Sequence, residues 1–248
     1  MKISIITACF NSESTIRDTI ESVLAQDYGN IEYIIIDGGS IDTTISIVTE
    51  YNERISKIVS EKDDGIYFAL NNGIALATGE VIAFLHADDI FAHEKVISSV
   101  RNWFDHHKCD AVYGDLQYVD RLDTSRIIRN WKSGIYHPGQ FLKGWMPPHP
   151  AFFMKKSCYA RHGVFNTTFR TAADYELMLR MIHLHKVPLA YLPQVMVKMR
   201  VGGVSNVSLK NRIKANREDK RAWIENGLRP GMLTLIRKPI GKIGQFFE

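Results

Sequence analysis

Short apolar runs alternate with helical stripes over the first 105 residues, and this alternation constrains the fold more than any other feature of the chain. The run at residues 3–8 is rich in β-branched residues, as expected of a strand buried on both faces, and 31–36 is predicted as a second buried strand. Further strands are predicted at 57–60 and 81–85. Between the first two runs, apolar residues from Ile16 to Leu24 recur with helical spacing. The alternation predicts an α/β fold with a doubly wound, mostly parallel sheet.

Beyond Asp110 the pattern loosens. Strand-like pieces at 111–113, 116–119 and 126–131 are followed by a stretch rich in Gly, Pro and aromatic residues. A further helix is predicted from Asp174 to about His185, because apolar residues recur there on one side. We expect this half of the chain to complete the sheet and not to form an independent domain.

The composition narrows the class of protein. A hydrophobic fraction of 45% and a charged fraction of 23% in 248 residues are typical of a soluble globular chain, and they argue against a disordered or repetitive one. Three scattered cysteines fit a reducing compartment better than a disulfide framework or a zinc site. No stretch approaches the ~20 apolar residues that span a bilayer, and the N-terminal run is too short for a signal peptide. The chain is therefore expected to be cytoplasmic.

Aspartates follow the predicted strands. Because the carboxyl ends of parallel strands meet at one edge of a sheet, these aspartates are expected to converge: Asp37, Asp42, Asp63, Asp64, Asp88 and Asp89. Clustered carboxylates usually hold a cation, and oxygen ligands favour Mg²⁺ or Mn²⁺, whose natural companion is a diphosphate. Asp88 and Asp89 form the best candidate metal site, although a pair of aspartates can equally cap a helix or form a turn.

Ordered motifs carry a resemblance to a known family. The chain resembles the family 2 glycosyltransferases, and most closely the bacterial branch that builds capsule, exopolysaccharide and lipopolysaccharide. Each motif alone is weak, but five in the correct order are specific. The motifs occupy 7–11, 37–44, 60–67 and 85–89, and the match continues through 149–153 and 173–176 to 202–205.

The resemblance implies a fold and a reaction. It implies a GT-A fold, with a Rossmann-like sheet and a smaller acceptor-side subregion, over residues 1–206. Residues 1–108 would form the nucleotide-sugar-binding half and 109–206 the acceptor half. The expected reaction is transfer of a sugar from a nucleotide diphosphate, UDP by default, to a hydroxyl, with inversion at the anomeric carbon and with Mn²⁺ or Mg²⁺ as cofactor.

The resemblance also implies residue roles. Thr7, Ala8 and Asn11 would line the nucleotide pocket, Asp37 would bind the base, and Asp64 would join the nucleotide-sugar contacts. Asp88 and Asp89 match a D-x-D-type element: one would bind the metal and the other the ribose or the metal shell, and the sequence does not divide these roles. Asp174 matches the general base, at the start of the helix that faces the acceptor.

Two further residues are candidates for acceptor or diphosphate contacts. His149 lies among prolines in the acceptor half, where a plain structural role is the alternative. Arg200, just before a Gly-Gly pair, could close over the diphosphate or simply end a strand. Because the Gln-x-x-Arg-Trp element of processive synthases and membrane spans are both missing from the sequence, addition of one sugar at a time is expected.

Residues 207–248 form a basic, partly amphipathic tail. From Leu209 to Lys242 it holds ten Lys or Arg against three acids, while apolar residues such as Trp223 are interleaved with the charges. Segments of this kind can lie on anionic lipid surfaces. We therefore expect the tail to dock the protein on the inner face of the cell membrane, near a lipid-linked acceptor, with a merely solvated face as the alternative.

Other functions fit less well. A sugar nucleotidyltransferase would need a Gly-rich, basic loop after the first strand, which residues 8–11 do not supply. A degenerate transferase, acting as a scaffold or sugar-binding module, is disfavoured by the intact Asp37, Asp88, Asp89 and Asp174. No recognised nucleic-acid-binding motif accompanies the basic tail, so nucleic acid is not an expected partner.

Overall fold

A nine-stranded sheet forms the centre of the molecule in this computed structural model, which describes residues 1–202 and 209–231. The strand order is β3-β2-β1-β4-β8-β6-β9-β5, and β7 pairs with β6 off this path. The strands are β1 (Ile3–Cys9), β2 (Ile31–Asp37), β3 (Lys57–Ser60), β4 (Val81–Phe84), β5 (Asp89–Phe91), β6 (Ala111–Val119), β7 (Ile127–Trp131), β8 (Phe152–Lys155) and β9 (Leu189–Arg200).

The strand directions create one edge at which many strands end. β1 pairs in parallel with β2 and β4, and β2 pairs in parallel with β3. β8 runs antiparallel to both β4 and β6, so β6 and its parallel neighbour β9 point the same way as β1 to β4. The carboxyl ends of these six strands therefore lie along one edge, where a doubly wound sheet binds its ligands.

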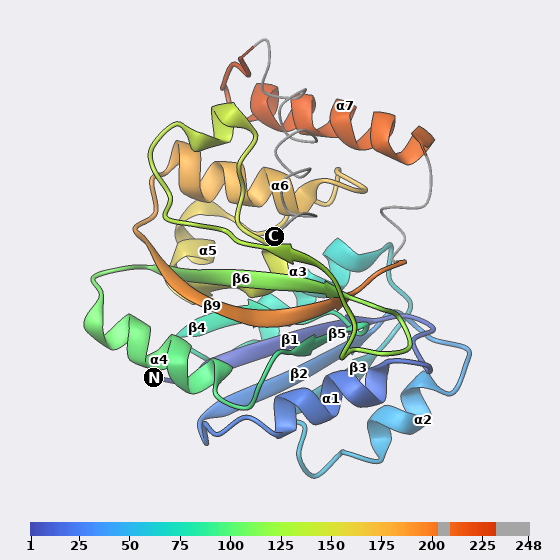
Figure 1. The fold of residues 1–248 in the computed structure, drawn as a ribbon. Coiled ribbons are helices and arrows are strands. Elements are labelled where there is room, and N and C mark those ends of the chain that lie inside the picture. Colours follow the sequence, from blue (N-terminus) through green and yellow to red (C-terminus); the bar gives the residue numbers. More distant parts are fainter. Residues whose placement is uncertain (203–208, 232–248) are drawn as a thin grey trace.

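Helices cover both faces of the sheet (Figure 1). One face is covered by α1 (Ile16–Leu24), α2 (Thr44–Thr49) and α4 (Val96–His106). The other face is covered by α3 (Ile66–Leu76), α5 (Lys156–His162) and α6 (Ala173–Met178), and α7 (Leu209–Glu225) lies outside α6. Two 3₁₀ turns, η1 (Gln140–Lys143) and η2 (His149–Ala151), and a π-helical segment, η3 (Leu179–Leu184), complete the elements of the described residues. The predicted α/β class with a mostly parallel sheet is confirmed.

A glycine sets how closely α3 packs on β1. A Cβ atom at Gly73 would lie 2.4 Å from Cγ2 of Ile6, which is closer than real carbon atoms approach. Because α3 begins directly after the third motif at the carboxyl edge, this close packing also fixes the segment 61–68 relative to β1.

The second half differs from the prediction in three places. Residues 111–119 form one nine-residue strand, β6, and not two pieces, since the polar Asp115 is accommodated by hydrogen bonds from the Tyr191 hydroxyl and the Ser133 amide. The expected helix from Asp174 is divided, because α6 ends at Met178 and η3 continues it with π-helical geometry. The strands β5, β8 and β9 and the helix α5 were not predicted at all.

Helix α7 packs against α6 as part of the molecule's body. Trp223 is 1% exposed and joins the same core as Tyr175 of α6, so this tryptophan is not available to a lipid surface. The prediction treated it as one of the apolar residues of a separate tail. The rest of that tail, 207–208 and 232–248, lies outside the described residues, as does most of the 202–205 motif.

Candidate active site

Turns that follow β1 and β2 are joined to each other at the carboxyl edge. The Asn11 amide donates to Oγ of Ser40 at 2.8 Å, and the Ile41 amide donates to Oδ1 of Asn11 at 3.0 Å. Asn11 has a left-handed backbone, with φ of 48°, which asparagine tolerates better than most residues. Asn11, a predicted nucleotide contact, therefore lies exposed at this edge and ties the two turns together.

Asp37 organises the turn after β2. It is fully buried, and its carboxylate accepts hydrogen bonds from the Gly39 and Ser40 amides and from the hydroxyls of Ser40 and Ser60. Gly39 has φ of 82°, a conformation that favours glycine. Sequence reasoning assigned Asp37 to the base of the nucleotide. The structure gives both of its oxygens to the turn.

The first motif contributes mainly to the core. Thr7 is fully buried, and its hydroxyl lies 3.1 Å from the hydroxyl of Tyr33. Ala8 belongs to the core on the opposite face of the sheet. Of the three residues expected to line the nucleotide pocket, the structure thus places Asn11 at the surface of the edge and the side chains of Thr7 and Ala8 inside.

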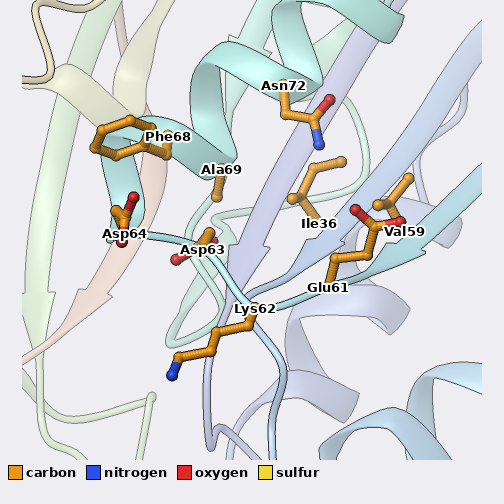
Figure 2. A pocket seen from close by; sticks show the side chains of 9 residues that line it. All are labelled: Ile36, Val59, Glu61, Lys62, Asp63, Asp64, Phe68, Ala69 and Asn72. Carbon is orange, nitrogen blue, oxygen red and sulfur yellow. The ribbon is translucent and has the colours of Figure 1, made fainter.

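A pocket of 310 Å³ lies beside these turns (Figure 2). Ile36 and Val59 from β2 and β3 form its apolar floor, while Phe68 and Asn72 contribute from α3. Asp64, a predicted nucleotide-sugar contact, is exposed at the pocket. The remaining lining residues are Glu61, Lys62, Asp63 and Ala69. A flat apolar surface with an aromatic ring and several hydrogen-bonding groups suits a heterocyclic base.

Asp88 lies in the turn after β4, and Asp89 begins β5, which pairs with β9. Arg200 donates to the carbonyl oxygens of Asp88, at 3.0 Å, and Arg121, at 3.1 Å, and it forms an ion pair with Asp18. Arg200 is only 5% exposed. Its guanidinium is therefore committed to fixing this turn. Arg200 also ends β9, as the alternative stated for it has it, and its contact with a diphosphate stays a prediction.

The Asp89 carboxylate is the least satisfied polar group of the candidate site. It is 1% exposed, and neither of its oxygens has a hydrogen-bond partner. Burial and the neighbouring Asp88 raise the pKa of Asp89 well above its ordinary value, while the charge of Arg200 opposes that shift. A buried carboxylate without a partner is costly, and a divalent cation is the partner that removes the cost.

These residues fit a metal ion that the substrate helps to hold. Within residues 1–202 and 209–231, no group of three or more His, Cys, Asp or Glu side chains is arranged to hold a metal ion. Mg²⁺ commonly binds through one or two carboxylates plus substrate phosphates and water. Asp88 and Asp89 supply the two carboxylates.

Asp174 lies across from this pair, at the start of α6. Its Oδ1 is 3.5 Å from the hydroxyl of Tyr67, at the start of α3. Both Asp88 and Asp174 act electrostatically on His86, and both Asp89 and Asp174 act on Tyr118. The predicted metal pair and the predicted base, 85 residues apart in the sequence, thus both influence the pKa values of His86 and Tyr118.

Two histidines lie behind the site. The rings of His86 and His149 are 5.4 Å apart, and His149 also stacks on Phe84. His149 is 7% exposed, neither of its ring nitrogens has a partner, and burial followed by repulsion from His86 lowers its pKa to about 3. The burial and the stacking of His149 agree with the plain structural role that was its alternative, and a contact with acceptor or diphosphate stays a prediction.

A second, larger pocket of 390 Å³ was not expected. It lies between η3 and the amino-terminal halves of β6 and β9, and its lining includes Tyr113, Tyr136 and Tyr191. The only signal in the sequence was the stretch rich in Gly, Pro and aromatic residues around Tyr136.

Comparison with known proteins identifies the family. The sequence model of "Glycosyl transferase family 2" matches residues 4–169. An uncharacterized glycosyltransferase of Mycobacterium tuberculosis is 34% identical over 181 residues, which are 72% of this chain and 68% of the relative. The chain belongs to glycosyl transferase family 2. Another relative, a PGL/p-HBAD biosynthesis glycosyltransferase of Mycobacterium bovis, is 28% identical over 208 residues, which are 82% of this chain and 78% of the relative.

Solved structures share the fold of this glycosyltransferase. A crystal structure of Staphylococcus aureus TarS, residues 1–349, in complex with UDP-GlcNAc has a TM-score of 0.70 at 17% identity over 93% of this chain and 68% of that one. A mannosyltransferase of Pyrobaculum calidifontis in complex with GDP-Man and Mn²⁺ has a TM-score of 0.66 at 18% identity over 90% of this chain and 63% of that one. The chain spans 41% of the longer TarS structure. The predicted GT-A fold is confirmed.

Proposed function

We propose that this glycosyltransferase transfers a single sugar from a UDP-sugar to a hydroxyl of a glycan or lipid-linked acceptor, with inversion at the anomeric carbon. The observation that carries the proposal is the 310 Å³ pocket beside the turns at the carboxyl ends of β1, β2 and β3, with Asp88 and Asp89 directly after the neighbouring β4, in a chain of glycosyl transferase family 2. Two carboxylates for a cation and a third for a proton are what such a displacement needs.

The nucleotide would bind at the turns after β1, β2 and β3. The pocket there offers an apolar floor and a free carboxylate at Asp64, beside the turn that Asn11 and Asp37 hold. The TarS structure contains UDP-GlcNAc, and the mannosyltransferase structure contains GDP-Man and Mn²⁺. These neighbours support a nucleotide-sugar donor, and UDP remains the family-based choice of nucleotide.

Asp88 and Asp89 would hold Mn²⁺ or Mg²⁺ together with the diphosphate of the donor. When bound there, the cation neutralises the charge that develops on the departing diphosphate. The buried Asp89 carboxylate supports this assignment, because burial and the neighbouring Asp88 outweigh the stabilisation that Arg200 gives it. Arg200 contributes indirectly, since it fixes the Asp88 carbonyl and thereby the turn.

Asp174 would act as the general base. A sugar hydroxyl is a weak nucleophile, so a carboxylate must accept its proton while the oxygen attacks C1 of the donor. The new C1–O bond forms on the face opposite the bond to the diphosphate, which breaks, so a single displacement inverts the configuration. Tyr67, 3.5 Å from Asp174, would hold the carboxylate in place.

The acceptor would approach from the α6 side, in residues 109–206. A relative is named for PGL/p-HBAD biosynthesis, which supports a glycolipid or other lipid-linked acceptor. Within the described residues, no helix is both long and apolar enough to cross a bilayer. We keep the proposal that the enzyme works at the inner face of the cell membrane, with the tail beyond residue 231 as the anchor.

Release of free nucleotide tests this function. UDP-GlcNAc, UDP-glucose, UDP-galactose and GDP-mannose are each incubated with the protein and Mn²⁺, with water as the initial acceptor. We expect UDP release from one UDP-sugar, and a loss of ~100-fold or more in Asp174→Asn. Asp105→Asn, on the exposed surface of α4, serves as the matched control and should keep full activity. Equal rates in wild type and Asp174→Asn would remove the proposed base.

A further inference from the structure

Helix α6 begins without a cap of its own. Its N-cap residue is Ala172, and no side chain of the N-cap makes a capping hydrogen bond. Asp174, the proposed base, lies in the first turn of this helix. The first turn of a helix leaves backbone N–H groups without partners inside the helix, so something else must fix it.

Glu218 of α7 supplies that fixation from outside. Its Oε1 accepts a hydrogen bond from the Arg170 amide at 3.1 Å, and its Oε2 accepts from the amide and the hydroxyl of Thr171 at 2.8 and 2.7 Å. Burial raises the pKa of Glu218, but these hydrogen bonds outweigh burial, and the net shift lowers its pKa. Glu218 thus remains a carboxylate and binds the loop three and four residues before Asp174.

Two more residues of α7, and Asn226 directly after it, contact the chain on both sides of Asp174. Before it, the Arg221 guanidinium lies 4.4 Å from the ring centre of Phe169 and donates to the Thr168 hydroxyl at 2.7 Å. After it, Trp223 donates to the Tyr175 hydroxyl at 2.9 Å, and Asn226 donates to Glu176 at 3.0 Å. The segments on both sides of Asp174, residues 168–171 and 175–176, therefore both contact α7 or the residue that follows it.

We propose that Glu218 is a positioning residue for Asp174, and that the docking of α7 sets where the Asp174 carboxylate lies. The inference rests on the proposed function, because it matters for the reaction only if Asp174 is the base. A displacement of about 1 Å at a reacting group can cost as much as ~100-fold in rate. Helix α7, which lies after the family-matched residues 4–169, would thus help to position the base.

Backbone hydrogen exchange tests the positioning without any substrate. In Glu218→Gln one carboxylate oxygen becomes an amide N–H₂, which cannot accept from the loop, so amides 173–176 should exchange about tenfold faster than in wild type. Glu225→Gln is the matched control on the same helix, since the bonds of Glu225 go to the side chains of Asn166 and Arg221. Unchanged exchange at 173–176 in Glu218→Gln would overturn the proposal.

A double-mutant cycle tests whether Glu218 acts through Asp174. Release of UDP from UDP-GlcNAc by water is measured under single-turnover conditions at high enzyme concentration. Glu218→Gln should slow release about tenfold when Asp174 is present and less than twofold in Asp174→Asn, with the Kd for UDP-GlcNAc unchanged. An equal loss in both backgrounds would overturn the proposal, because it would mean a general loss of folded enzyme.

The failure of this inference and the failure of the proposed function give different results. Absence of UDP release from every form, wild type included, contradicts the proposed donor, and the exchange measurement then decides the positioning role alone. Should Glu218→Gln unfold, Thr171→Val removes only one of the three hydrogen bonds and leaves α7 unchanged. That variant should speed exchange at 173–176 about threefold, and no change in it would overturn the proposal.

Discussion

Two aspartates at the carboxyl edge have opposite environments. Asp37 is fully buried and accepts hydrogen bonds from the turn after β2 and from Ser60 of β3. Asp64 is exposed and faces the 310 Å³ pocket. A buried carboxylate that is fully hydrogen-bonded maintains local structure. A carboxylate at the mouth of a pocket is available to a ligand.

Replacing each of these aspartates by asparagine should separate stability from binding. Asp37→Asn puts an N–H₂ group against donors and should lower the free energy of unfolding by roughly 2–4 kcal/mol. Asp64→Asn should change it by less than about 0.5 kcal/mol, as surface substitutions do, and should weaken UDP-sugar binding instead. Urea denaturation and isothermal titration measure the two quantities. Similar losses of stability in both variants would contradict the assignment.

His149 should make stability depend on pH. Its ring is neutral in the folded protein, with a pKa of about 3, but it binds a proton below about 6.5 when unfolded. Stability is therefore lost as the pH falls from 6.5 towards 3, by about 2 kcal/mol at pH 5. His149→Phe, which can keep the stacking on Phe84, should reduce the loss between pH 7 and pH 5 by that amount.

The matched control for this pH effect is His106→Phe, at an exposed position on α4. Denaturant unfolding at pH 7 and pH 5 is compared for the three proteins. If His149→Phe loses as much stability on acidification as wild type and His106→Phe do, then His149 is not held neutral by burial.

Much of the candidate site could be predicted at the residue level, but the division of roles could not. The position of aspartates after strands predicted that Asp37, Asp64 and Asp88 would gather at one edge, because strand direction is encoded in the alternating pattern. The alternation of strands and helices does not encode which of these carboxylates will accept hydrogen bonds in the folded protein. The turn satisfies Asp37, while Asp89 is left without partners, and this difference depends on distant residues such as Ser60 and Arg200.

At the scale of elements, α7 joins the acceptor half to the tail. It packs on α6 through Trp223 and holds the loop before Asp174 through Glu218. Its positive charge suggested a separate, membrane-facing segment, but the apolar residues of its inner face find partners within the molecule. The positive charge of this helix was evident from the sequence. The packing of Trp223 on α6 was not.

Truncation on either side of α7 should isolate its contribution. A chain that ends at Asn206 lacks the helix, and a chain that ends at Gly231 keeps it. Loss of the buried Trp223 and its hydrogen bond alone should cost ~3 kcal/mol or more, so the shorter chain should melt well below the longer one. Equal melting temperatures would show that α7 does not stabilise α6.

The first four strands could be predicted because each is a short run, and β1, β2 and β4 are buried whereas β3 is only half-buried. The strands β8 and β9 could not be predicted. β8 is only four residues long and lies antiparallel between β4 and β6, which are 26 residues apart in the chain. β9 carries Pro193 and several polar residues and is only partly buried. Such strands form because neighbouring strands pair with them, and this tertiary effect is not visible in the local sequence pattern.

At the scale of the whole molecule, two halves meet at one edge. The parallel strands β1 to β4 carry the nucleotide pocket and the metal pair, while α6 and α7 carry and fix the proposed base. β9 connects the halves directly, because its last residue, Arg200, bonds to Asp88 while its first half lies beside η3. The fold therefore places the residues proposed for the cation, the donor and the base on elements from three distant parts of the chain.

The central claim is that this edge binds a nucleotide sugar together with a divalent cation. Thermal melting with UDP-, GDP-, CMP- and dTDP-sugars, each with Mn²⁺ and with EDTA, tests it most directly, since a ligand that binds only the folded state raises Tm. We predict a rise with UDP-sugars that requires Mn²⁺ and disappears in Asp89→Asn, while the Tm of that variant in EDTA equals or exceeds that of wild type. A rise that is the same in EDTA, or that survives Asp89→Asn, would contradict the proposed metal site, and no rise with any sugar nucleotide would contradict the donor site.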